Sequence, residues 1–239
     1  MMDDGARAAR GLFVTGTDTG VGKTLVAAGL LRLARRQGLV PIPFKPVETG
    51  CDPEPADARR LWRAAGAPIP AADVCLHALP LPAAPALAAA AAGRTIDLIA
   101  VADRAYALGQ RGDFLVVEGA GGLLVPYAGS ETTADLAARI GLPLLVVGRT
   151  ALGTINHVAL TLAEAARRRL PVAGYLLSRT DSEAGPHESG NAEMIAAITG
   201  RRPLGIVPHI PPESRDDDDR AADAVAAAIG EDGLRALFG

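Results

Sequence analysis

Short apolar runs alternate along the whole chain with longer stretches in which apolar residues recur at helical spacing. The run at 143–148 is apolar almost throughout, as expected for a strand that is covered on both faces. The stretch at 24–37 places Leu and Ala on one side and Arg on the other, which is typical of an amphipathic helix. This alternation predicts an α/β fold: a doubly wound, mainly parallel sheet with helices on both faces.

The same patterns locate the individual elements. Strands are expected over residues 12–16, 40–47, 113–122, 143–148, 172–178 and 204–208. Helices are expected over residues 24–37, 57–65, 96–110, 133–140, 156–169, 191–199 and 220–237. The prolines in 40–47 indicate an edge strand or a strand start, and the Pro- and Ala-rich segment 66–93 is expected to be an ordered connection with a short helix. The 239 residues are interpreted as one domain, 1–239, with a frayed tail over residues 1–11.

Composition argues against several classes of function. The net charge is −3 and no Lys/Arg-rich run occurs, so neither nucleic acid nor an anionic membrane is an expected partner. No apolar run reaches transmembrane length, since the Ala-rich stretch 83–92 is short and contains Pro85. Cys51 and Cys75 do not form a disulfide framework, and no secretory signal is visible. We therefore expect a protein of the reducing cytoplasm.

The stretch VTGTDTGVGKT, residues 14–24, follows the first apolar run and opens a predicted helix. The phosphate-binding template is G-x-x-x-x-G-K-[ST], and alignment on Gly22-Lys23-Thr24 puts Thr17 at its first position. The loop is still suited to bind an anion, because Gly20 and Gly22 let backbone N–H groups approach phosphate oxygens at a helix N-terminus. Lys23 can neutralise phosphate charge, and Thr24 can place its hydroxyl on Mg²⁺.

Lysine is rare in this chain. Of 24 Lys and Arg residues only two are Lys, namely Lys23 and Lys45. A compact ammonium group fits among phosphate oxygens better than a planar guanidinium group does. Lys45 follows a strand that is expected beside the first one, so it would face the γ-phosphate from the acceptor side. A second cation there suits phosphoryl transfer to a small anionic nucleophile.

Oxygen ligands for magnesium are available at the same strand ends. Thr24 would supply one oxygen, and Glu118, at the end of the third predicted strand, would supply a carboxylate. Asp57 is a further candidate ligand, with Asp52 as its competitor.

At this point the chain resembles the dethiobiotin synthetase family. The segments VTGTDTGVGKT, KPVETG, VEGAGG and GTINH occur in the family's order and spacing, and the match spans essentially the whole chain. The resemblance implies a homodimeric P-loop enzyme that converts 7,8-diaminononanoate, CO₂ and ATP into dethiobiotin, ADP and phosphate with Mg²⁺. It also implies a carbamate and a carbamic–phosphoric anhydride as intermediates.

The resemblance assigns roles to individual residues. Nucleotide binding is implied for Thr19, Gly20, Val21, Gly22, Lys23, Thr24, Glu118, Ser178 and Pro208. Stabilisation of the transferring group and the carbamate is implied for Lys23 and Lys45, with a hydrogen bond from Thr49. Diamine binding is implied for Thr49, Gly121 and Gly122, and binding of the substrate carboxylate near the dimer interface for Gly153, Thr154 and Asn156. Magnesium ligation is implied for Thr24, Asp57 and Glu118.

Two other functions remain open for such a sequence. A partitioning or positioning ATPase would carry a Lys where Asp18 stands, and it often has a basic or membrane-binding surface. An amide ligase of the cobyrinic-acid synthase type usually carries a fused glutaminase with a nucleophilic Cys, a context that Cys51 and Cys75 lack.

Ser178 generates a prediction about the nucleotide. The family usually has Asn there to read adenine, and a hydroxyl cannot present the donor–acceptor pair of a carboxamide. The segment 208–213 would then hold the base instead through backbone groups. We expect comparable steady-state turnover with ATP, CTP and GTP; strict preference for ATP would contradict this prediction.

Overall fold

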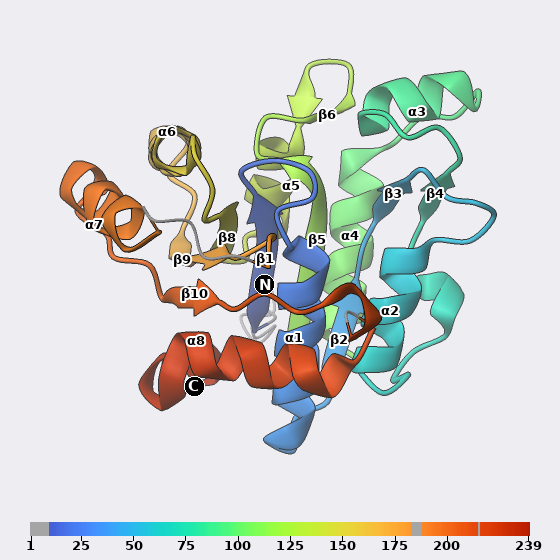
Figure 1. Ribbon diagram of the computed structural model, residues 1–239. Helices are drawn as coiled ribbons and strands as arrows, with labels where there is room; N and C mark the ends of the chain where they lie inside the picture. Colours follow the sequence, from blue (N-terminus) through green and yellow to red (C-terminus); the bar gives the residue numbers. More distant parts are fainter. Residues whose placement is uncertain (1–9, 183–187, 215) are drawn as a thin grey trace, which may run out of the picture.

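The computed structural model describes residues 10–182, 188–214 and 216–239, and its centre is a six-stranded sheet (Figure 1). The strand order is β10–β9–β8–β1–β5–β2, and every pairing in it is parallel. These strands are β1 (Gly11–Gly16), β2 (Pro41–Phe44), β5 (Phe114–Gly122), β8 (Leu144–Arg149), β9 (Val172–Ser178) and β10 (Gly205–Val207). The predicted doubly wound, mainly parallel fold is confirmed.

Helices cover both faces of the sheet (Figure 1). They are α1 (Lys23–Arg36), α2 (Ala56–Ala64), α3 (Pro85–Ala91), α4 (Leu98–Gly109), α5 (Thr133–Ile140), α6 (Thr154–Arg167), α7 (Glu188–Thr199) and α8 (Asp218–Phe238), with the short 3₁₀ helices η1 (Ala71–Asp73) and η2 (Pro212–Ser214). The predicted helices are confirmed to within a few residues at their ends. The predicted tail lies largely outside the described residues, although Gly11 already begins β1.

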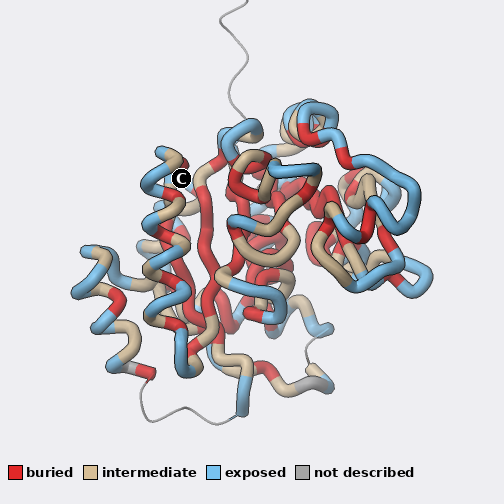
Figure 2. The backbone as a smooth tube through the Cα atoms, turned by 90° about the horizontal axis from the view of Figure 1, so that it is seen from above, coloured by how far each residue is buried: buried red, intermediate tan, exposed pale blue. Residues whose placement is uncertain are grey.

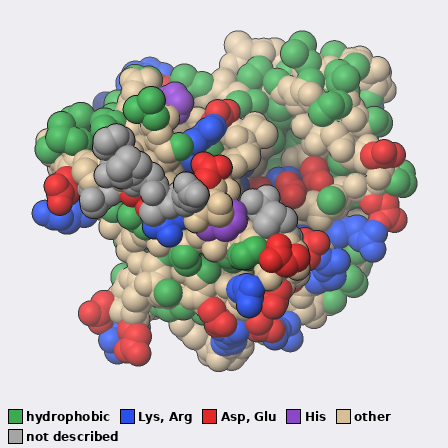
Figure 3. Space-filling view, viewed as in Figure 1, with side chains coloured by type: hydrophobic (Ala, Val, Ile, Leu, Met, Phe, Trp, Pro, Cys, Tyr) green, Lys and Arg blue, Asp and Glu red, His purple; other side chains and the backbone are tan. Residues whose placement is uncertain are grey.

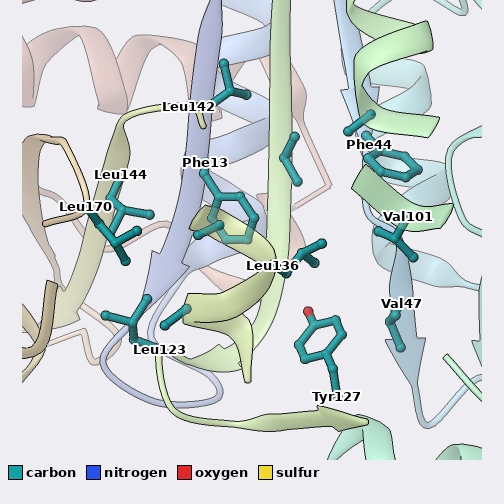
Figure 4. Packing of buried hydrophobic residues seen from close by; sticks show 14 of the residues in the cluster. Phe13, Phe44, Val47, Val101, Leu123, Tyr127, Leu136, Leu142, Leu144 and Leu170 are labelled. Atoms are coloured by element: carbon teal, nitrogen blue, oxygen red, sulfur yellow. The ribbon is translucent and has the colours of Figure 1, made fainter. Parts of the chain in front are cut away.

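The apolar strand runs supply two separate cores, because alternate residues point to opposite faces. Phe13 and Leu144 pack with α4–α7, whereas Val14 and Leu145 pack with α1 and α8. Buried residues accordingly concentrate on the strands, between outer helices that alternate buried and exposed positions (Figure 2). Figure 4 shows Phe13 and Leu136 of the first core close together. Each such side chain contributes about 1.5–3 kcal/mol through burial.

The predicted strand over residues 40–47 is wrong in its length and its neighbour. Residues Pro41–Phe44 form β2 at the sheet edge and pair with β5, so β1 lies between β5 and β8 instead of beside β2. Pro46 cannot donate a backbone hydrogen bond, and the chain leaves the sheet at that point. Val47–Thr49 form a separate strand, β3.

Two small sheets flank the main one and were not predicted. Strand β3 pairs in parallel with β4 (His77–Leu79), which lies inside the segment 66–93 together with the expected short helix, α3. Strands β6 (Pro126–Ala128) and β7 (Glu131–Thr132) form an antiparallel hairpin after β5. These strands are only two or three residues long, which is too short for a periodic signal in the sequence.

Gly29 permits the close packing of α1 on α8. A Cβ atom at this position would lie 2.8 Å from the carbonyl oxygen of Ala221 and 2.8 Å from Cγ2 of Val225. Gly190 of α7 provides a matched control, because a Cβ atom there would meet no described heavy atom within 4 Å.

We expect Gly29→Ala to lower the free energy of unfolding by about 1–3 kcal/mol, because overpacking outweighs the helix preference of alanine. Gly190→Ala should leave stability unchanged or raise it by up to about 1 kcal/mol. Urea denaturation of both variants measures the difference, and equal midpoints would show that the α1–α8 contact tolerates the methyl group.

Candidate active site

A cavity of about 470 Å³ opens at the carboxyl ends of the central strands. Figure 3 shows a hollow on this face in which acidic and basic side chains lie side by side. Most of the predicted site residues line the cavity, namely Thr19, Gly20, Gly22, Lys23, Thr24, Lys45, Thr49, Asp57, Glu118, Gly121 and Ser178. The sheet therefore brings together residues that are up to 159 positions apart (178 − 19).

The loop between β1 and α1 has the backbone that an anion site requires. Gly22 adopts the left-handed region with φ of 97° and directly precedes α1. A Cβ atom at Gly22 would lie 2.7 Å from Oγ of Ser178, so only glycine fits between the loop and the end of β9. Nζ of Lys23 donates to the backbone carbonyl of Asp18 at 2.8 Å. The carboxylate of Asp18 in turn accepts from Arg149 at 2.8 Å.

A buried polar network forms the floor of the cavity. Nζ of Lys45 lies 2.5 Å from Oε1 of Glu118 and 3.0 Å from Oδ2 of Asp57. The hydroxyl of Thr24 donates to the same Oε1 at 2.8 Å. Glu118 is fully buried and Lys45 is 4% exposed. Three elements and one connection thus meet here: α1, α2, β5 and the link between β2 and β3.

Charge and burial shift the pKa values of this network in opposite directions. Burial by itself would lower the pKa of Lys45, but the Glu118 and Asp57 carboxylates outweigh it and hold the pKa above its ordinary value. Burial would raise the pKa of Asp57, and the Lys45 ammonium overcomes this and lowers it. For Lys23 burial dominates and lowers the pKa to about 8. Lys45 therefore stays charged at neutral pH. An anionic ligand next to Lys23 would stabilise the charged form of that side chain.

The oxygen atoms in this cluster fit a magnesium ion. Oε2 of Glu118 is buried and has no hydrogen-bond partner among the described residues, although buried carboxylate oxygens are normally satisfied. The hydroxyl of Thr24 and the carboxylate of Asp57 line the cavity next to it. Hard oxygen donors of this kind are what Mg²⁺ prefers. Asp52, the alternative ligand, is exposed and does not line the cavity.

Several predicted site residues lie away from the cavity wall. Val21 is fully buried in the core beneath α1. Gly122 does not line the cavity and lies in register with Gly16 of β1. Pro208 is exposed and does not line the cavity, although the two residues after it do. The turn 153–156 at the N-terminus of α6 does not line this cavity either.

Other residues contribute to the site although the sequence did not single them out. The carboxylate of Glu48 accepts hydrogen bonds from the backbone N–H groups of Asp57 at 3.0 Å and Ala58 at 2.9 Å, and so caps α2. Buried Tyr127, whose hydroxyl is visible in Figure 4, accepts a hydrogen bond from N–H of Ala120 at 2.8 Å. Only Glu48 had a local signal, since it stands within KPVETG.

Comparisons with known proteins agree with this geometry. A family model described as an AAA domain matches residues 10–216. The ATP-dependent dethiobiotin synthetase BioD of Anaeromyxobacter dehalogenans (strain 2CP-C) is 51% identical over 207 residues, which cover 86% of this chain and 93% of that protein. The chain belongs to the ATP-dependent dethiobiotin synthetase family. A family member from Bacillus cereus (strain B4264) is 39% identical over 201 residues, 83% of each chain.

Solved structures show that the synthetase family shares its fold with other proteins. The MinC:MinD cell division protein complex of Aquifex aeolicus is similar with a TM-score of 0.60 at 15% identity, over 97% of this chain and 96% of that chain. The cell division ATPase MinD of Pyrococcus furiosus gives 0.52 at 17% identity, over 96% and 95%. These likenesses confirm the α/β P-loop fold. Within the described residues, no helix combines the length and apolar character needed to cross a membrane.

Lys23 generates a prediction about pH. Its pKa of about 8 means that the ammonium loses its proton as the pH rises through 8, and a neutral amine cannot pair with phosphate. We expect the Kd of the free protein for Mg-ATP to be constant below about pH 7 and to rise by up to about tenfold per pH unit above pH 8. Calorimetric titration across this range measures the effect, and a Kd that stays constant to about pH 9 would contradict it.

Proposed function

We propose that this protein is an ATP-dependent cyclo-ligase that closes the ureido ring of dethiobiotin from 7,8-diaminononanoate and CO₂, a step of biotin biosynthesis. The observation that carries the proposal is the pairing of a phosphate-binding loop with a second buried lysine, Lys45, in one cavity. An enzyme that only hydrolyses ATP needs no second cation beside the group that accepts the phosphoryl group. The name of the relatives supports the same substrates.

The proposed reaction has three steps whose atoms balance. One amine of the substrate adds to CO₂ and loses a proton, which gives a carbamate. A carbamate oxygen attacks the γ-phosphorus, the bond to ADP breaks, and a carbamic–phosphoric anhydride forms. The second amine attacks the carbamoyl carbon and loses a proton, and phosphate leaves with the bonding electron pair as the ring closes.

The residues of the cavity would divide the work between them. Lys23 neutralises the phosphates, and Lys45 stabilises the charge that develops between the carbamate and the γ-phosphate. Thr49 lines the cavity beside Lys45 and donates a hydrogen bond to the carbamate. Thr24, Asp57 and Glu118 would hold the magnesium ion, which when bound supplies further positive charge at the phosphates.

The nucleotide and the diamine would occupy different parts of the cavity. Thr19, Gly20 and Gly22 would contact the phosphates, and Ser178 would lie toward the base; all four line the cavity. Gly121 lines the cavity near the end of β5, where the diamine would bind.

The substrate carboxylate would be bound by a second copy of the chain. The N-terminus of α6, with Gly153 at its cap, offers backbone N–H groups to an anion but does not line its own cavity. Leu152 beside it is 95% exposed and Leu160 of α6 is 61% exposed, as suits an interface. A homodimer that buries these leucines would bring the turn 153–156 of one copy to the cavity of the other.

Isotope fixation tests the proposed function. Purified protein is incubated with 7,8-diaminononanoate, labelled bicarbonate and Mg-ATP, and acid-stable label is counted. Label that is fixed only when diamine and ATP are both present supports ureido-ring formation. ATP hydrolysis without fixation would overturn the proposal and leave a nucleotide site of another kind.

Glu118 generates a prediction about the metal. Glu118→Gln removes a charged magnesium ligand while keeping the shape of the side chain, so we expect the half-saturating Mg²⁺ concentration to rise at least about tenfold and turnover to fall. Glu131→Gln is the matched control, because Glu131 pairs with Arg139 at the surface. An unchanged magnesium titration of Glu118→Gln would remove this residue from the metal site.

A further inference from the structure

Arg60 lies on the cavity wall without a role in the chemistry described above. It follows Asp57 by three residues on α2, so the two side chains lie on the same side of the helix and both line the cavity. Nε of Arg60 donates to Oδ1 of Asp218, the first residue of α8, at 3.2 Å. Only 11% of the side chain is exposed.

One guanidinium nitrogen of Arg60 is left without a partner. Nη2 is buried and makes no hydrogen bond to any described residue. A buried donor on a charged group is costly when it is unsatisfied, and folded proteins nearly always provide a partner. The ion pair with Asp218 uses a different nitrogen, Nε, and therefore does not engage Nη2.

The other Lys and Arg residues of the cavity wall are engaged with protein groups. Lys23 donates to the carbonyl of Asp18, and Lys45 is held between Glu118 and Asp57. Arg179 pairs with Glu188. Among the Lys and Arg residues of the described cavity wall, Arg60 is thus the one with a buried side-chain donor that lacks a hydrogen bond. A desolvated guanidinium N–H is best satisfied by an anionic oxygen, and phosphate is the anion that this cavity would receive.

We propose that Arg60 is a nucleotide-binding residue that donates from Nη2 to a phosphate oxygen of the bound nucleoside triphosphate. Asp218 orients the guanidinium group through Nε. Asp218 also begins α8, and the segment that precedes this helix in the chain carries His209 and Ile210 on the cavity wall. Arg60 would therefore join the helix of Asp57, the nucleotide and this segment.

The inference rests on the proposed function only in that a nucleoside triphosphate occupies the cavity. Its test is the Kd for Mg-ATP measured by calorimetry without diamine, so it does not depend on which product is formed. If label fixation fails while the binding effect of Arg60 is present, the proposed reaction is wrong and the binding role stands. If label fixation is intact while the Arg60 variants bind Mg-ATP normally, the binding role of Arg60 is wrong and the proposed reaction stands.

We expect Arg60→Gln to raise the Kd for Mg-ATP about tenfold, the loss typical of one hydrogen bond to a charged group. The increase should be the same for Mg-CTP and Mg-GTP, because phosphate is common to all three. Arg59→Gln is the matched control, because the side chain of Arg59 is half-exposed and pairs with Glu54 on the surface. We expect its Kd to equal that of the unchanged protein.

Asp218→Asn separates the ligand contact from the ion pair. It removes the charge that pairs with Arg60 while leaving Nη2 in place, so we expect it to raise the Kd by less than about threefold. Thermal denaturation of all three variants identifies any that fail to fold, and Arg60→Lys then serves as a second variant that keeps the charge but loses the planar fork. Arg60→Gln and Arg60→Lys that both bind Mg-ATP as tightly as Arg59→Gln would overturn the proposal. The proposal would also be overturned if Asp218→Asn weakened the binding of Mg-ATP as much as Arg60→Gln does. The same holds if Arg60→Gln raised the Kd for only one of the three nucleotides.

Discussion

The buried ion pair between Lys45 and Glu118 is the constraint on which the active-site end of this molecule depends. Two desolvated charges are tolerable only when they are paired and hydrogen-bonded, and removing one partner of such a pair typically costs about 3–5 kcal/mol. Because Lys45 follows β2, Glu118 lies in β5, and Asp57 and Thr24 begin α2 and α1, all four must be placed together. The fold that buries the pair therefore also assembles the site.

The small sheets outside the main one explain how this assembly is held. Strand β3 places Glu48 at the N-terminus of α2, where its carboxylate caps the helix and fixes the backbone of Asp57. The β6–β7 hairpin places Tyr127 beside the last residues of β5, where its hydroxyl accepts a hydrogen bond from the N–H of Ala120. Each of these two residues contributes by fixing the backbone that carries a residue of the site.

The fold alone does not decide the function. Cell division proteins of the MinD type share this architecture at 15–17% identity. The proposed function of the present chain rests instead on particular side chains at the strand ends, above all Lys45 and the two carboxylates that pair with it. Asp18, where a partitioning ATPase would carry a lysine, forms an ion pair with Arg149 of the same chain.

The sequence by itself determined the alternation of strands and helices, the phosphate-binding loop, and the choice of Lys23, Lys45 and Glu118 as charged residues of the candidate site. These features are local: apolar periodicity, glycine positions and short motifs can all be recognised within a few residues. Only the tertiary structure decided that β2 pairs with β5, that Asp57 and not Asp52 faces the cavity, and that Arg60 lines its wall. Strand order, short strands and partners far apart in sequence depend on which surfaces pack together, and that information is not contained in any single segment.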